Sequence, residues 1–145
     1  MYFSIRLPKG TIEDAKKRSV RILLAEDNRI NQLFALKILN ELGYNADAVK
    51  NGHEAVKALE MKHYDLVLMD IQMPEMDGLE ATAEIRKRRS EVTDSDIPII
   101  AVTAHAMKGD KEQCLEAGMD DYLTKPIDPE SLAEKLEHWI FKKAG

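Results

Sequence analysis

Five short apolar runs alternate with segments of helical periodicity, and this alternation restricts the possible folds more than any other feature of the chain. The runs occupy residues 20–26, 44–49, 64–70, 96–104 and 119–125. Helices are predicted at 28–43, 51–62, 77–89, 105–118 and 128–143, where apolar residues recur at helical spacing. Strict alternation favours parallel strands joined by right-handed crossovers. We therefore predict an α/β fold over residues 20–145, a doubly wound five-stranded parallel sheet with five helices.

Turn and cap residues agree with these boundaries. Gly43 is a predicted helix stop, Asn51 is a predicted N-cap, and Asp128 with Pro129 begins the last predicted helix. Residues 1–19 precede the pattern, and we interpret them as a leader or linker. The polar stretch 88–96 is predicted to be a mobile loop.

Charge and composition argue against several classes of protein. The net charge of −5 does not favour a nucleic-acid-binding surface. The chain lacks a run of about 18 apolar residues, so we expect no membrane contact through a spanning segment. Its one cysteine, Cys114, cannot form an intrachain disulfide, and a reducing cytoplasm is the expected compartment.

Polar residues gather where the predicted strands end. Glu26 and Asp27 follow the first strand, Asp70 ends the third, Thr103 lies at the end of the fourth, and Lys125 ends the fifth. Ligands of open parallel sheets bind at the carboxyl ends of the strands. We therefore expect three carboxylates, one hydroxyl and one amine to meet at one edge of the sheet.

This combination of groups predicts a phosphoryl-binding site. Adjacent carboxylates raise each other's pKa unless a cation is present, and a hard ion such as Mg²⁺ takes oxygen ligands. Lys125 can neutralise one charge, and Thr103 can donate a hydrogen bond to a phosphoryl oxygen. A carboxylate can itself be the nucleophile and form an aspartyl phosphate.

Four stretches carry a family resemblance: "LLAEDN", "LVLMDIQMPEMDG", "PIIAVTAHAMKGD" and "CLEAGMDDYLTKPI". They resemble, in order and over residues 20–142, the receiver domains of two-component response regulators, most of all those of hybrid sensor histidine kinases. The resemblance implies a flavodoxin-like receiver topology. It also implies that Asp70 is the phosphoacceptor of a phosphorelay.

The resemblance further assigns the surrounding residues. Asp27, Asp70 and the backbone carbonyl of Gln72 would bind Mg²⁺, with Mn²⁺ as a substitute ion. Glu26, where many receivers have aspartate, would act on the metal through water.

Other implied roles concern the phosphoryl group and the switch. Thr103 and Lys125 would contact the phosphoryl group, and Lys125–Pro126 would be a cis peptide. Thr103 and Tyr122 would be the switch residues, and the helix at 104–117 would shift. His105, two residues past Thr103, is a candidate for controlling water near the acyl phosphate.

The implied partners are the phosphohistidine domain of a histidine kinase and a histidine phosphotransfer domain. "YFSIRLP" near the start resembles the closing strand of a kinase ATP-binding domain, which favours a C-terminal fragment of a hybrid kinase. The alternative is a stand-alone single-domain regulator. The domain itself would be a phosphoacceptor that catalyses its own dephosphorylation.

Three other functions fit less well. Phosphatases with an aspartate nucleophile commonly need a second acid two residues later, and here that residue is Gln72. A flavin carrier needs a phosphate-cradling loop after the first strand, where this chain has "EDN". A degenerate receiver that only binds a partner would lack one of the key residues, and none is missing.

Overall fold

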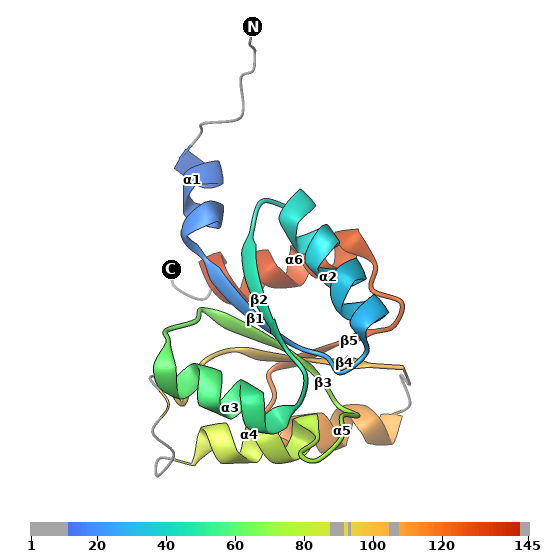
Figure 1. Ribbon diagram of the computed structural model, residues 1–145. Coiled ribbons are helices and arrows are strands. Elements are labelled where there is room, and N and C mark those ends of the chain that lie inside the picture. Colours follow the sequence, from blue (N-terminus) through green and yellow to red (C-terminus); the bar gives the residue numbers. More distant parts are fainter. Residues whose placement is uncertain (1–11, 88–91, 93, 105–107, 143–145) are drawn as a thin grey trace, which may run out of the picture.

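The sheet has the predicted parallel, doubly wound form (Figure 1). A computed structural model describes residues 12–87, 92, 94–104 and 108–142. Its strands lie in the order β2-β1-β3-β4-β5, and every neighbouring pair is parallel. They are β1 (Arg21–Ala25), β2 (Asn45–Val49), β3 (Leu66–Asp70), β4 (Ile99–Thr103) and β5 (Asp121–Thr124). The predicted fold class is therefore confirmed, and β3 is the central strand.

Helices cover both faces of this sheet (Figure 1). They are α2 (Arg29–Glu41), α3 (Gly52–Met61), α4 (Gly78–Arg86), α5 (Lys108–Ala117) and α6 (Pro129–Leu136), whereas α1 (Ile12–Ser19) extends beyond the sheet before β1. Successive residues of each strand point to opposite faces, so β1 sends Ile22 towards α2 and α6 and Leu23 towards α3 and α4. Because both faces are covered, β3 and β4 are buried along their whole length.

Two helical segments differ from the sequence prediction of five helices. The structure adds α1 before the sheet, within residues interpreted as leader or linker. Its sequence "IEDAKKRS" carries no apolar stripe, so periodicity does not reveal it. Its C-terminal end is held from a distance, because Asn45 Nδ2 donates to the carbonyl of Arg18 at 2.6 Å. The last predicted helix changes at Glu137 into the π-helix η1 (Glu137–Lys142).

Caps position the helices beside the sheet's carboxyl edge. Asn28, Asn51, Asp77 and Asp128 each accept a hydrogen bond from a backbone N–H of the helix that follows. The predicted caps Asn51 and Asp128 are thus confirmed. Gly43 follows α2 with φ +97°, a conformation in which glycine is favoured.

Candidate functional site

The polar residues at the strand ends come together as the sequence predicts. Glu26 and Asp70 are buried, with 4% and 5% of their surfaces exposed, whereas Asp27 is exposed. Each of these three residues offers a carboxylate oxygen, and the three oxygens lie within 4.8 Å of one another. They line a cleft of about 400 Å³, which Thr103 and Lys125 also line.

Lys125 contacts two carboxylates rather than one. Its Nζ lies 2.8 Å from Glu26 Oε1 and 3.1 Å from Asp70 Oδ2. The backbone holds this lysine in place, because its N–H donates to the carbonyl of Thr103 at 2.8 Å. The peptide bond between Lys125 and Pro126 is cis.

The two buried carboxyl groups differ in their electrostatics. Burial, together with the charge of Glu26, raises the pKa of Asp70 to about 6, and the Lys125 ammonium only partly offsets this. For Glu26, burial is outweighed by hydrogen bonds from Lys125 and from the Asn28 N–H, and the pKa is lowered. Without a cation, Glu26 therefore holds the negative charge beside Lys125, and Asp70 is the group that resists ionisation.

The donor set fits a hard divalent cation. Asp27 and Asp70 offer carboxylate oxygens, and Gln72 lies at the rim of the same cleft. The Gln72 N–H donates to Asp70 Oδ1 at 3.1 Å, which fixes the backbone beside the carboxylate. Mg²⁺ prefers oxygen ligands of this kind and commonly uses only one or two carboxylates. The described residues that line the cleft include no methionine or cysteine, and Met69 and Met73 are buried in the apolar core.

A tight connection joins Asp70 to the next helix. The Gly78 N–H donates to the carbonyl of Ile71 at 2.9 Å, and a Cβ on Gly78 would overlap the backbone carbonyl of Asp70. Asp77 and Glu80 form a reciprocal capping box at the start of α4. Only glycine allows α4 to begin this close to the end of β3, so the loop that carries Gln72 is held against the site.

The two predicted switch positions lie on neighbouring strands. Thr103 ends β4 and is buried, and its Cα partner in the β4–β5 ladder is Thr124. Tyr122 is half-buried on β5, with the Lys111 and Lys135 ammonium groups 5.3 and 5.8 Å from its ring centre. His105 lies outside the described residues, and so does the predicted start of the helix, since α5 is described from Lys108.

Sequence reasoning missed one residue that supports the site. Gln32 on α2 is buried, and its amide donates to the Glu26 carbonyl at 2.6 Å and to the Val49 carbonyl at 3.3 Å. It thereby fixes the backbone that carries Glu26 and Asp27. The available signal was a polar residue on the buried stripe of a helix, beside Ala35 and Leu39.

The comparison with protein families settles the relationship. Residues 22–137 match the model of the response regulator receiver domain. The chain belongs to the response regulator receiver family. No helix in the described residues is long and apolar enough to cross a membrane.

Curated relatives of this receiver are much longer proteins. It is 46% identical to the sensor protein GacS of Pseudomonas syringae over 122 residues, which is 84% of this chain and 14% of GacS. It is 48% identical to hybrid signal transduction histidine kinase I of Dictyostelium discoideum, covering 84% of this chain and 7% of that kinase. The receiver thus spans a small part of each relative, and those relatives are sensor kinases.

Solved receiver structures share both fold and sequence. The receiver domain of sensor histidine kinase PA1611 from Pseudomonas aeruginosa, with magnesium in its active-site cleft, is 45% identical with a TM-score of 0.75, covering 83% of this chain and 97% of that one. A chain from the Saccharomyces cerevisiae complex of Ypd1, a histidine phosphotransfer protein, with the Ssk1 receiver is 33% identical with a TM-score of 0.76, covering 87% and 92%.

Proposed function

We propose that Asp70 accepts a phosphoryl group from the phosphohistidine of a histidine kinase, and that this receiver is a cytoplasmic part of a hybrid histidine kinase. The observation that carries the proposal is the burial of Asp70 at the centre of the sheet edge, 3.1 Å from Lys125 and close to Asp27. The similarity to GacS and to the Dictyostelium hybrid kinase supports the hybrid origin. The N-terminal residues that resemble a kinase ATP-binding domain lie outside the described residues.

In this mechanism an Asp70 carboxylate oxygen attacks phosphorus. The phosphorus–nitrogen bond of the donor breaks, and the imidazole keeps the electron pair and takes up a proton. A divalent ion held by Asp27, Asp70 and the Gln72 carbonyl, with Glu26 acting through water, would offset negative charge on the phosphoryl oxygens. The Lys125 ammonium offsets charge on the same oxygens from the side of β5.

Phosphorylation would then change the outer strands and helices. A phosphoryl group adds negative charge and strong hydrogen-bond acceptors at Asp70. We propose that the Thr103 hydroxyl turns towards it and that Tyr122 takes up the vacated space. The readout face would be formed by α5, β5 and α6, where Lys111 and Lys135 flank Tyr122 over a groove.

The donor domain would dock on the apolar end of α2. Ile30, Leu33 and Phe34 are 75%, 52% and 49% exposed. Phe34 also lines a small groove with Pro126 and Lys125, which connects this apolar surface to the site. A receiver bound to the phosphotransfer protein Ypd1 is among the similar structures, which supports a partner of the same kind.

The main test is labelling by phosphoramidate, a small phosphodonor, in Mg²⁺ and in EDTA. We expect a gain of one phosphoryl group in the intact mass, dependent on Mg²⁺, and its loss in Asp70→Asn. Asp65→Asn is the matched control, because Asp65 is a half-buried carboxylate that accepts from the Arg21 N–H, at the opposite end of β1. Labelling of Asp70→Asn at the wild-type level would refute the assignment.

A second measurement isolates the docking surface. Phe34→Asp should slow transfer from a phosphorylated histidine phosphotransfer domain and leave labelling by phosphoramidate unchanged. Equal losses with both donors would place Phe34 in the chemistry or the folding of the site rather than in docking. A genomic reading frame that begins at Met1 would contradict the hybrid-kinase origin.

A further inference from the structure

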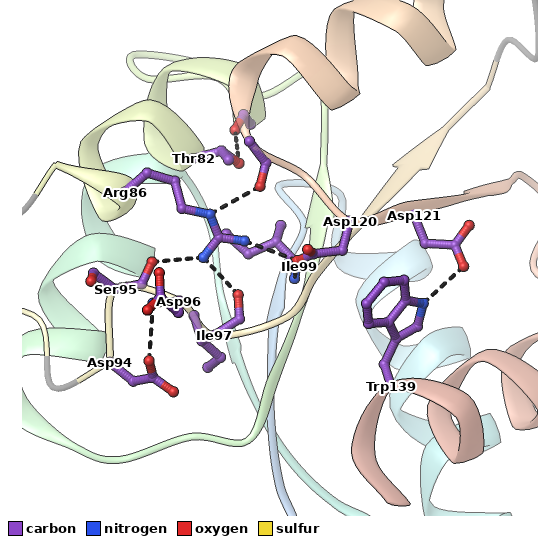
Figure 2. A network of polar contacts seen from close by, with 12 residues as sticks. Thr82, Arg86, Asp94, Ser95, Asp96, Ile97, Ile99, Asp120, Asp121 and Trp139 are labelled. Atoms are coloured by element: carbon purple, nitrogen blue, oxygen red, sulfur yellow. Dashed lines mark hydrogen bonds and ion pairs between the residues drawn. The ribbon is translucent and has the colours of Figure 1, made fainter. Parts of the chain in front are cut away.

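Two adjacent acids at the start of β5 form hydrogen bonds with helices that lie on opposite faces of the sheet. Asp120 precedes the strand, and Asp121 is its first residue. Figure 2 shows the Asp120 side chain turned towards Arg86 of α4, and the Asp121 side chain turned towards Trp139 of η1. Neighbouring residues of an extended chain point to opposite faces, which explains the divergence. The start of β5 is therefore held from both helical layers.

On one face, Arg86 links several separate segments (Figure 2). Its guanidinium donates to the carbonyls of Gly118, Ser95 and Ile97 at 2.9, 2.8 and 2.7 Å. It also donates to Asp120 Oδ2 at 2.9 Å, and the two side chains are only 20% and 25% exposed. This planar fork of donors is specific to arginine, and lysine cannot reproduce it.

Asp120 connects the Arg86 guanidinium to the start of β4. The Ile99 N–H donates to Asp120 Oδ2 at 2.8 Å, and the Asp120 N–H donates to the Ile99 carbonyl at 2.8 Å. The same carboxylate oxygen thus accepts from Arg86 and from the first residue of β4. These bonds fix where β5 starts along β4.

On the other face, Asp121 is bonded to the C-terminal helices. It accepts from Lys135 Nζ and from Trp139 Nε1, each at 2.9 Å. These contacts matter because β5 is an edge strand of four residues that pairs only with β4 in the described sheet. An edge strand this short has few ladder hydrogen bonds of its own to fix its position.

The far end of β5 carries Lys125 into the site. Lys125 lies five positions after Asp120, roughly 16 Å along an extended chain. The Lys125 N–H is bonded to Thr103 at the end of β4, as Asp120 is bonded to Ile99 at its start. Because β5 has only four residues, a displacement of its start at Asp121 also moves its end, where Lys125 follows.

We propose that Arg86 and Asp120 are positioning residues, which set the place of β5 along β4 and so hold the Lys125 ammonium within reach of Glu26 and Asp70. This inference rests on the proposed phosphoacceptor function. It assigns a role in that reaction to a pair at the opposite end of the sheet, which touches neither the metal ligands nor the phosphoryl group. A misplacement of about 1 Å at a reacting group can slow a reaction by as much as about 100-fold.

The test compares rates of phosphoramidate labelling at saturating Mg²⁺. Arg86→Met should slow labelling about 10-fold without weakening Mg²⁺ binding, because Lys125 is not a metal ligand and its ammonium repels the cation. Asp120→Asn keeps an acceptor for the Ile99 N–H and should slow labelling less, and it serves if Arg86→Met does not fold. Lys87→Met is the matched control, since Lys87 is the next basic residue, is exposed, and lies 3.4 Å from the carboxylate of half-buried Glu84 in the same helical turn.

A double-mutant cycle tests whether Arg86 acts on the labelling rate through Lys125. In a Lys125→Met background, Arg86→Met should cause no further slowing, because the group that it positions is gone. Slowing by the same factor in both backgrounds, a parallel loss of Mg²⁺ affinity, or wild-type rates in folded Arg86→Met would each overturn the proposal.

A second readout separates this inference from the proposed function. The ¹⁵N signal of the Lys125 ammonium in the metal-free protein should shift in Arg86→Met and stay in place in Lys87→Met. If the wild type fails to label at Asp70, the proposed function is wrong, and an unshifted Lys125 signal in Arg86→Met would still refute the positioning role.

Discussion

Replacing Asp70 by asparagine should stabilise the metal-free protein. Burial of this carboxylate, with the charge of Glu26 nearby, raises its pKa to about 6. The ordinary value is about 3.9, so keeping the group ionised in the folded state costs about 3 kcal/mol. Asparagine has nearly the same shape and retains an acceptor for Lys125, and Asp70→Asn removes this cost.

The sign of the effect fixes its dependence on pH. The pKa of Asp70 is higher in the folded protein than in the unfolded chain. The charged carboxylate therefore lowers the free energy of unfolding by its full amount above about pH 6, and this effect is absent below about pH 4. Urea titrations in EDTA should show Asp70→Asn more stable than the wild type by about 3 kcal/mol at about pH 7.5. The difference should shrink to less than about 1 kcal/mol at about pH 4, where Asp70 is protonated in the folded wild type and about half protonated in the unfolded chain.

Asp27→Asn is the matched control for this experiment. It removes the same charge from the same cleft, but Asp27 is exposed and its carboxylate stays hydrated. We expect its stability to change by less than about 1 kcal/mol. If Asp70→Asn were no more stable than the wild type in EDTA at about pH 7.5, or if its gain persisted at about pH 4, buried charge would not be the cause.

Further predictions concern the elements around the site. Gly78→Ala should lower the free energy of unfolding by about 3 kcal/mol, because its Cβ would overlap the carbonyl of Asp70, and an unchanged urea midpoint would contradict this close approach. Asp77→Ala removes the N-cap of α4 and should cost about 1 kcal/mol in the same titration, whereas Asp77→Asn should retain most of the cap. Hydrogen bonds from Trp139 and Lys135 outweigh burial and lower the pKa of Asp121, so they contribute stability above about pH 4 that is lost as the pH falls through the folded pKa. Trp139→Phe should therefore raise the pKa of Asp121 in an NMR titration, and an unchanged value would show that the indole does not stabilise the carboxylate.

The sheet and its polar edge were predictable because they depend on local patterns. The apolar run that ends at Asp70 could be recognised as a buried strand, and strict alternation made it parallel to its neighbours. Parallel strands end at the same edge, so Glu26, Thr103 and Lys125 had to approach Asp70. Pattern and topology together were therefore sufficient for the location of the cleft.

Contacts that depend on three-dimensional packing were not predictable. In the sequence Arg86 is only a basic residue in the last turn of a helix, yet its partners Gly118 and Asp120 lie more than thirty positions away. The pairing of Lys125 with Glu26 as well as Asp70 depends on distances that spacing does not encode. The helix α1 was missed for a similar reason, since Asn45 holds its C-terminal end.

The central place of β3 also has a consequence for how the domain opens. Strands on both sides cover its backbone, and helices cover both of its faces. Amides in such a strand exchange with solvent only in the largest opening reactions, whereas edge strands and terminal helices exchange in smaller ones. Protection should therefore fall from β3 towards β2 and β5. The outer elements can fray or rearrange many times while the residue beneath the cleft, Asp70, stays in the last part of the protein to unfold.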